Sequence, residues 1–138
     1  MKENKTTKKK VSEKKAEEYF NKKTKDVKDA DLEKVIKSEK KLANKFSTVK
    51  VLTKYVDQFK LLIAIIKDYK NGKYKDIPWY SIAAIGVALL YILLPVDLIP
   101  DFIPFVGYID DITVLLICLK MVQSDIEKYE VWKSKQKS

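Results

Sequence analysis

The 138-residue sequence contains no histidine and no arginine, and its one cysteine is Cys118. Without histidine, the Ser-His-Asp and Cys-His nucleophilic pairs and histidine-ligated zinc sites are excluded. A single cysteine can neither close an internal disulfide nor form a thiolate cluster. All 28 cationic side chains are lysines, so bidentate recognition of phosphate or guanine by a guanidinium is excluded as well. We therefore expect neither an enzyme nor a cofactor-binding protein.

Charge is segregated along the chain. Residues 1–75 hold 23 lysines against 11 acids, residues 76–119 hold five aspartates and no lysine, and residues 120–138 hold five lysines and three acids. A basic arm and a basic end therefore flank an apolar middle whose only charges are negative.

The first 31 residues contain four large apolar side chains: Val11, Tyr19, Phe20 and Val27. This is too little apolar surface to offset the entropy lost on ordering, so residues 1–31 are predicted to be a disordered or frayed arm. No apolar stretch follows the first lysines, and we expect no secretory signal.

The lysines of this arm could contact the phosphates of a nucleic acid or of an anionic lipid. However, residues 1–50 combine 17 lysines with nine acids, and their aromatic residues are not interleaved as a stacking platform. We keep a lysine-arm binding module as an alternative function and do not expect nucleic acid as a partner.

Residues 32–70 show helical periodicity, with apolar residues three or four apart from Leu32 to Ile66 and lysines between them. The pattern predicts an amphipathic helix, or two helices with a break near Ser47-Thr48, ended by Asn71-Gly72. This segment is either one wall of a helical bundle or a helix on an anionic membrane surface with its lysines outward.

Residues 77–96, IPWYSIAAIGVALLYILLPV, carry no charge. As a helix, this run would extend about 30 Å, the thickness of the hydrocarbon core of a bilayer. Trp79, Tyr80 and Tyr91 are candidate membrane-interface residues, and lysines precede the run as on a cytoplasmic flank. The alternative is a core helix of a soluble bundle, which needs neighbours on every side. We favour membrane insertion.

A second apolar block, Ile112 to Leu119, continues into an amphipathic pattern that reaches Trp132. The sequence thus predicts an all-α protein: an amphipathic helix plus an apolar helical hairpin domain at residues 77–133, embedded in or associated with a membrane, and a basic tail at 134–138. A multi-pass or hairpin arrangement with both basic ends in the cytoplasm satisfies the positive-inside rule. A re-entrant hairpin and a single span with a surface helix remain open.

The hairpin is joined by an Asp/Pro connector, residues 95–111, with the sequence PVDLIPDFIPFVGYIDD. The prolines oppose a regular helix, and the glycine allows a turn. The residues to which we assign a structural role in this motif are Pro95, Asp97, Pro100, Asp101, Pro104, Gly107, Asp110 and Asp111.

The four aspartates of the connector, Asp97, Asp101, Asp110 and Asp111, admit three interpretations. In the first, they cap exposed backbone N–H groups at helix starts. In the second, they form a site for a hard cation such as Mg²⁺ or Ca²⁺, although EF-hand spacing is absent. In the third, they mark a proton or ion route, or a contact for a partner.

The run LLPVDLIPDFIPFVGYIDDITVL, residues 93–115, resembles the signature of the YkvA-like family, small bacterial proteins with a domain of unknown function. The resemblance covers roughly residues 80–120 and implies a helical protein that is membrane-associated or multi-pass, with no defined activity. We accordingly expect a small helical integral membrane protein with a structural or adaptor role. Its expected partners are the lipid bilayer and either a second copy or another membrane protein. A cation- or proton-linked site at the aspartates is an alternative.

Overall fold

The computed structural model describes residues 14, 15, 17–93 and 111–136. Every regular element in these ranges is a helix, which confirms the all-α prediction. Residues 95–110 of the Asp/Pro connector lie outside the described residues.

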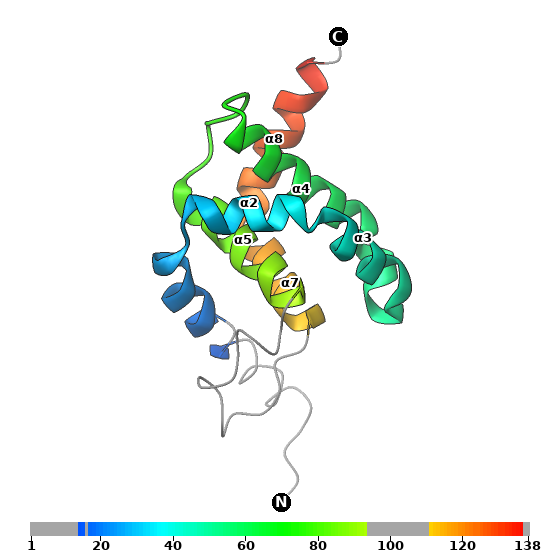
Figure 1. Ribbon diagram of the computed structural model, residues 1–138. Coiled ribbons are helices and arrows are strands. Elements are labelled where there is room, and N and C mark those ends of the chain that lie inside the picture. The colour runs from blue at the N-terminus through cyan, green and yellow to red at the C-terminus, as the bar shows by residue number, and fades with distance from the viewer. Residues whose placement is uncertain (1–13, 16, 94–110, 137–138) are drawn as a thin grey trace, which may run out of the picture.

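Residues 17–23 are helical and lead into a sequence of α-helices and 3₁₀ helices. In chain order these are η1 (Thr24–Asp26), α2 (Asp29–Lys37), α3 (Glu39–Thr48), η2 (Lys50–Tyr55), α4 (Val56–Lys70), α5 (Trp79–Leu93), α7 (Asp111–Met121) and α8 (Gln123–Gln136), as Figure 1 shows.

The periodic segment 32–70 forms one wall of a helical bundle. The break predicted near Ser47-Thr48 is present, because α3 ends at Thr48, and a further break falls at Ser38. The apolar stripe of this segment is turned into the protein: Leu32, Leu42 and Phe46 are fully buried. Of the two interpretations, the structure agrees with the bundle wall.

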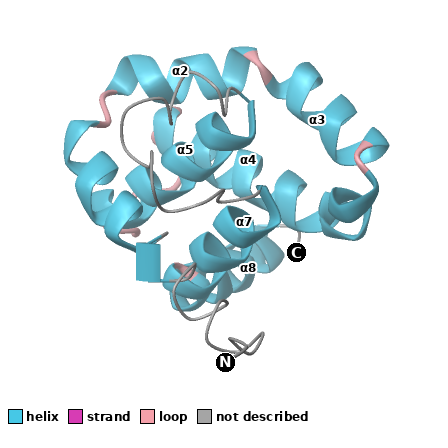
Figure 2. Cartoon of the chain, turned by 90° about the horizontal axis from the view of Figure 1, so that it is seen from below, coloured by secondary structure: helices cyan, strands magenta, loops and turns pink. Residues whose placement is uncertain are grey.

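Helix α5 is the centre of the bundle. Its residues 81–89 are all buried, and it packs against η1, α2, α3, α4 and α7. In Figure 2, α5 and α4 lie in the middle, with α2 and α3 on one side and α7 and α8 on the other. This arrangement agrees with the core helix that was the alternative to membrane insertion for this run. Among the described residues, η1, α2 and α3 supply part of the cover that such a helix needs, and α4 and α7 supply more.

Within residues 14–15, 17–93 and 111–136, no helix combines the length and the apolar character needed to cross a bilayer.

The N-terminal segment differs from its prediction. Tyr19 and Phe20 are buried in the core, and the Tyr19 ring lies edge-on to Tyr91 with centroids 5.7 Å apart. Thus the part of residues 1–31 that the structure describes is not a solvated arm. Its few apolar side chains include two adjacent aromatic rings, which bury enough surface on α5 to hold a short helix.

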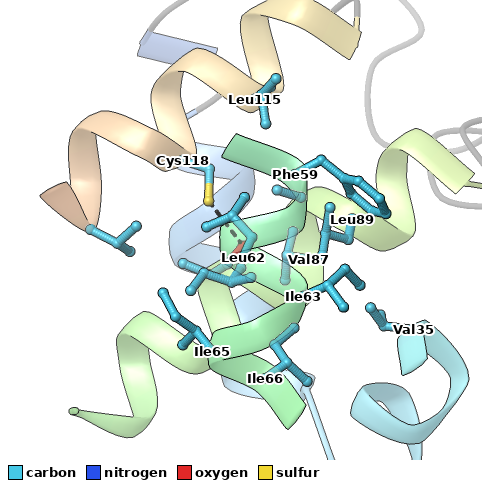
Figure 3. Packing of buried hydrophobic residues seen from close by; sticks show 14 of the residues in the cluster. Val35, Phe59, Leu62, Ile63, Ile65, Ile66, Val87, Leu89, Leu115 and Cys118 are labelled. Carbon is cyan, nitrogen blue, oxygen red and sulfur yellow. Dashed lines mark hydrogen bonds between the residues drawn. The ribbon is translucent and has the colours of Figure 1, made fainter. Parts of the chain in front are cut away.

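The core joins helices that are distant in sequence. Figure 3 shows Leu62 of α4 toward Cys118 of α7, whereas Ile66, farther along α4, lies toward Val35 of α2. The buried Cys118 thiol donates to the Ala84 carbonyl of α5 at 3.7 Å, and burial raises the pKa of this thiol to about 12.

The two apolar blocks pack against each other as α5 and α7, as expected for a helical hairpin. The block after the connector is divided at Val122 into α7 and α8. At the other end of α5, the Lys45 ammonium of α3 donates to the Ile92 carbonyl, which stabilises the last turn of a helix because its carbonyl groups lack intrahelical partners.

Candidate functional site

Most of the predicted motif residues lie outside the described residues: Pro95, Asp97, Pro100, Asp101, Pro104, Gly107 and Asp110. Asp111 is the first residue of α7. The structure therefore tests none of the capping, cation or proton interpretations of the four aspartates. Elsewhere in the described ranges, no group of three or more acidic or cysteine side chains is placed to hold a metal ion.

The predicted membrane-interface residues do not share one environment. Trp79 and Tyr80, at the start of α5, are 39% and 44% exposed, whereas Tyr91 near its end is fully buried. Tyr91 was expected near the opposite membrane interface. In the structure, the helical residues before η1 cover that part of α5 and place the Tyr19 ring against Tyr91.

The chain reaches Trp79 through a turn that is fixed to the end of α4. Gly72 adopts φ +79°, a conformation that glycine takes without steric cost, and its N–H donates to the Tyr69 carbonyl at 3.1 Å. The Tyr74 N–H then donates to the Asp68 carbonyl, also at 3.1 Å. Pro78 precedes α5, and its carbonyl accepts from the N–H groups of Ser81 and Ile82. The turn therefore holds the start of α5 close to the end of α4.

This turn gathers aromatic and lysine side chains, which together with Pro78 we call the aromatic–lysine surface: the half-buried Tyr69 and the exposed Lys75, Pro78, Trp79 and Tyr80. The rings of Tyr69 and Trp79 are 6.2 Å apart between centroids, and the Lys75 ammonium lies 4.1 Å from the Tyr69 centroid. That distance is within the range of a cation–π interaction. The surface thus combines positive charge with large amphipathic rings.

Tyr80 connects the surface to the N-terminal segment. Its hydroxyl donates to the Asn21 side-chain oxygen at 2.8 Å, and partial burial together with the nearby Glu17 carboxylate raises the pKa of Tyr80. The phenol therefore stays neutral at physiological pH.

At the end of α4 that precedes the turn, a buried carboxylate joins α4 to α8. Asp68 is 7% exposed and accepts from the Tyr129 hydroxyl at 2.7 Å and from the Lys133 ammonium at 3.2 Å. Burial, followed by the hydrogen bond and charge of Asp68, raises the pKa of Tyr129. These three residues, the Asp68 network, hold α8 beside the turn.

A second polar contact ties α8 to α5. The hydroxyl of Ser81, a buried residue in the first turn of α5, donates to the Asp125 carboxylate at 2.5 Å. Together with the Asp68 network, it fixes both ends of the turn against one face of α8.

Asp68 was not among the residues predicted from the sequence to have a role. The sequence contained one indication of its burial. Asp68 lies three residues after Ile65, at a position where the apolar stripe of the segment continues. Its partners are more than sixty residues away in the chain, so the local pattern gave no means of finding them.

Comparison with known proteins places residues 81–117, which include most of α5 and most of α7, in a family described as "Protein of unknown function (DUF1232)". The chain is 30% identical over 80 residues to a protein of Bacillus subtilis (strain 168) named "Uncharacterized membrane protein YkvA". The matched region is 58% of this chain and 76% of that protein. No solved structure matches the chain.

Proposed function

The chain belongs to the YkvA-like family of proteins of unknown function (DUF1232), and from this membership we propose that it is a membrane-associated helical protein with a structural or adaptor role and no enzymatic activity. It docks on an anionic bilayer through the aromatic–lysine surface. The observation that carries this proposal is the exposure of Trp79 and Tyr80 beside Lys75. The relative's printed name, a membrane protein, supports it.

The chemistry of the surface suits the boundary between lipid and water. Tryptophan and tyrosine are enriched there because their rings are apolar while their N–H and O–H groups still reach water. Each lysine near an anionic leaflet contributes about 1 kcal/mol of attraction. Lys73 and Lys75 are both exposed in the turn, and the net charge of the chain is +9, so the whole molecule is attracted to such a surface.

Docking at the surface leaves the bundle intact, since α5 keeps its contacts with five other elements. The alternative to surface docking is the multi-pass hairpin with both basic ends in the cytoplasm. The uncharged run 77–96 supports it, but it requires α5 to exchange its helical neighbours for lipid.

Vesicle co-sedimentation of the purified full chain tests the proposal. We expect binding to equimolar phosphatidylglycerol and phosphatidylcholine, weaker binding to pure phosphatidylcholine, and further weakening in high salt. The double variant Trp79→Ala/Tyr80→Ala is expected to lower the vesicle affinity about tenfold or more, equivalent to about 1.4 kcal/mol. Val51→Ala, which removes an exposed apolar side chain on η2, is the matched control. Equal binding by the double variant and the parent would overturn the docking proposal.

Carbonate extraction of cell membranes separates the two arrangements. A protein docked at the surface is released by carbonate, whereas an inserted hairpin stays with the lipid pellet. Retention in the pellet would therefore replace surface docking by the hairpin arrangement.

A further inference from the structure

A groove of about 670 Å³ lies between the turn that precedes α5 and the outer face of α8. Its floor is apolar and formed by Tyr74, Val131 and Trp132, and four lysines line its rim: Lys73, Lys75, Lys128 and Lys135. This volume is within the range of sites for small molecules, which typically pair an apolar lining with a few placed polar groups.

The floor is held in place by contacts below it. The Tyr74 ring lies 4.9 Å from the Trp132 ring and 5.2 Å from the Tyr129 ring, measured between centroids. Tyr129 in turn donates to the buried Asp68, so the aromatic residues are fixed to α4 as well as to α8. Val131, beside them, is 54% exposed and leaves apolar surface open to a ligand.

The rim favours an anion. Its four lysines face two carboxylates, Asp76 and Glu127, so the groove has an excess of positive charge. Asp76 pairs with Lys128 at 3.8 Å, but both side chains are largely exposed, and such a pair contributes little in water. A bound phosphate therefore competes with a weak ion pair.

We propose that this groove binds one anionic phospholipid, with the phosphate at the lysine rim and the glycerol and first acyl carbons on the aromatic floor. The inference rests on the proposed function and names the lipid class that the docked protein recognises. A free phosphate would use the rim alone, and a neutral lipid would use the floor alone. Lys75 belongs both to the groove and to the aromatic–lysine surface, so a lipid in the groove remains in the leaflet on which the protein docks.

The chain carries two tryptophans, one in each place: Trp79 on the aromatic–lysine surface and Trp132 in the groove. Trp79→Phe leaves a fluorophore that reports on the groove, and Trp132→Phe leaves one that reports on docking. The ligand for the groove is monomeric dihexanoyl-phosphatidylglycerol, and the surface is tested with the mixed phosphatidylglycerol and phosphatidylcholine vesicles.

We expect the short-chain anionic lipid to change the emission of Trp132 in the Trp79→Phe chain, while inorganic phosphate and dihexanoyl-phosphatidylcholine do not. Lys128→Gln/Lys135→Gln is expected to weaken this binding about tenfold or more. The matched control is Lys34→Gln/Lys37→Gln, which removes two exposed lysines of α2 away from the groove.

The two proposals fail separately. No response of Trp132 to the short-chain anionic lipid, together with a vesicle response of Trp79, overturns the groove and leaves docking intact. A response of Trp132 without one of Trp79 supports lipid binding in the groove and overturns docking. The lipid assignment is overturned if Trp132 responds as strongly to another probe as to the short-chain anionic lipid. An equal response to phosphate would indicate a free anion, one to the neutral lipid an apolar ligand, and one to polyglutamate an acidic protein segment.

Discussion

Asp68 illustrates how one buried charge is stabilised in this bundle. Its carboxylate accepts hydrogen bonds from a neutral hydroxyl and from an ammonium group, both on α8. Hydrogen bonds to a charged group contribute more than neutral ones, and a buried polar group left unpaired costs about 1–3 kcal/mol.

We therefore expect Asp68→Ala to lower the free energy of unfolding by about 2–4 kcal/mol, because it leaves the buried Tyr129 hydroxyl without its acceptor. Tyr129→Phe is expected to cost less, about 1–2 kcal/mol, since Lys133 still pairs with the carboxylate. Urea unfolding of both variants and of the double variant measures the coupling between the two side chains. Strictly additive losses would contradict the described hydrogen bond.

Buried groups with raised pKa values contribute to the response of the protein to alkali. Burial raises the pKa of Tyr19 and of Cys118 to about 12, and burial with the Asp68 contact raises that of Tyr129. A folded-state pKa above the unfolded value favours the protonated form in the folded state. The associated stability is complete below the unfolded pKa and is lost as pH rises through the folded one.

The ordinary pKa of a thiol, 9.0, is lower than that of a phenol, 10.0. As the pH rises, Cys118 is therefore the first of these groups to lower the stability of the folded protein. We expect the urea midpoint to fall as pH rises above about 9, with a smaller fall between about pH 9 and 10 in Cys118→Ala than in the parent. Urea titrations across this range provide the measurement. Parallel pH profiles for the two chains would show that the thiol has no part in the effect.

At the scale of the element, α5 and α2 approach each other closely at Gly86. A Cβ added to Gly86 would lie 3.2 Å from the Leu32 Cδ2 of α2. This contact is tighter than ordinary van der Waals distance, and Leu32 is itself fully buried. Glycine at this position lets the two helices pack at short range, although it costs about 1 kcal/mol in helix propensity.

We expect Gly86→Ala to change the free energy of unfolding by less than about 1 kcal/mol, because the gain in propensity offsets the displacement of Leu32. Gly86→Val is expected to destabilise by about 1–3 kcal/mol through overpacking. In a double-mutant cycle read from thermal or urea unfolding, the combined loss of Leu32→Ala and Gly86→Val should be smaller than the sum of the two single losses. Full stability of Gly86→Val alone would contradict the close approach.

At the scale of the whole molecule, the described part of the N-terminal segment contributes Tyr19 and Phe20 to the core. Phe20 is fully buried among residues of the same cluster as α4 and α5, although it lies in the most lysine-rich part of the chain. Phe20→Ala is expected to cost about 3–5 kcal/mol. Val51→Ala, at a 55% exposed site, should stay within about 0.5 kcal/mol in the same urea titration. A negligible cost at Phe20 would return the segment to the predicted solvated arm.

Local pattern was sufficient for much of the architecture. The spacing of apolar residues between Leu32 and Ile66 predicted helices, their buried side and the break near Ser47-Thr48, since these depend on neighbours within one or two turns. The aliphatic neighbours of Cys118 in the sequence favour burial of its thiol, and the thiol is buried.

The sequence by itself determined that the protein is helical, that its charge and apolar surface are segregated, and that α5 presents no polar face. Only the tertiary structure decided what covers α5, because a uniformly apolar helix has the same pattern against lipid as against other helices. The burial of Tyr91 by Tyr19 and the pairing of Asp68 with Tyr129 belong to the same class of result. Both join residues more than sixty positions apart, and such contacts depend on how the helices pack rather than on any local period.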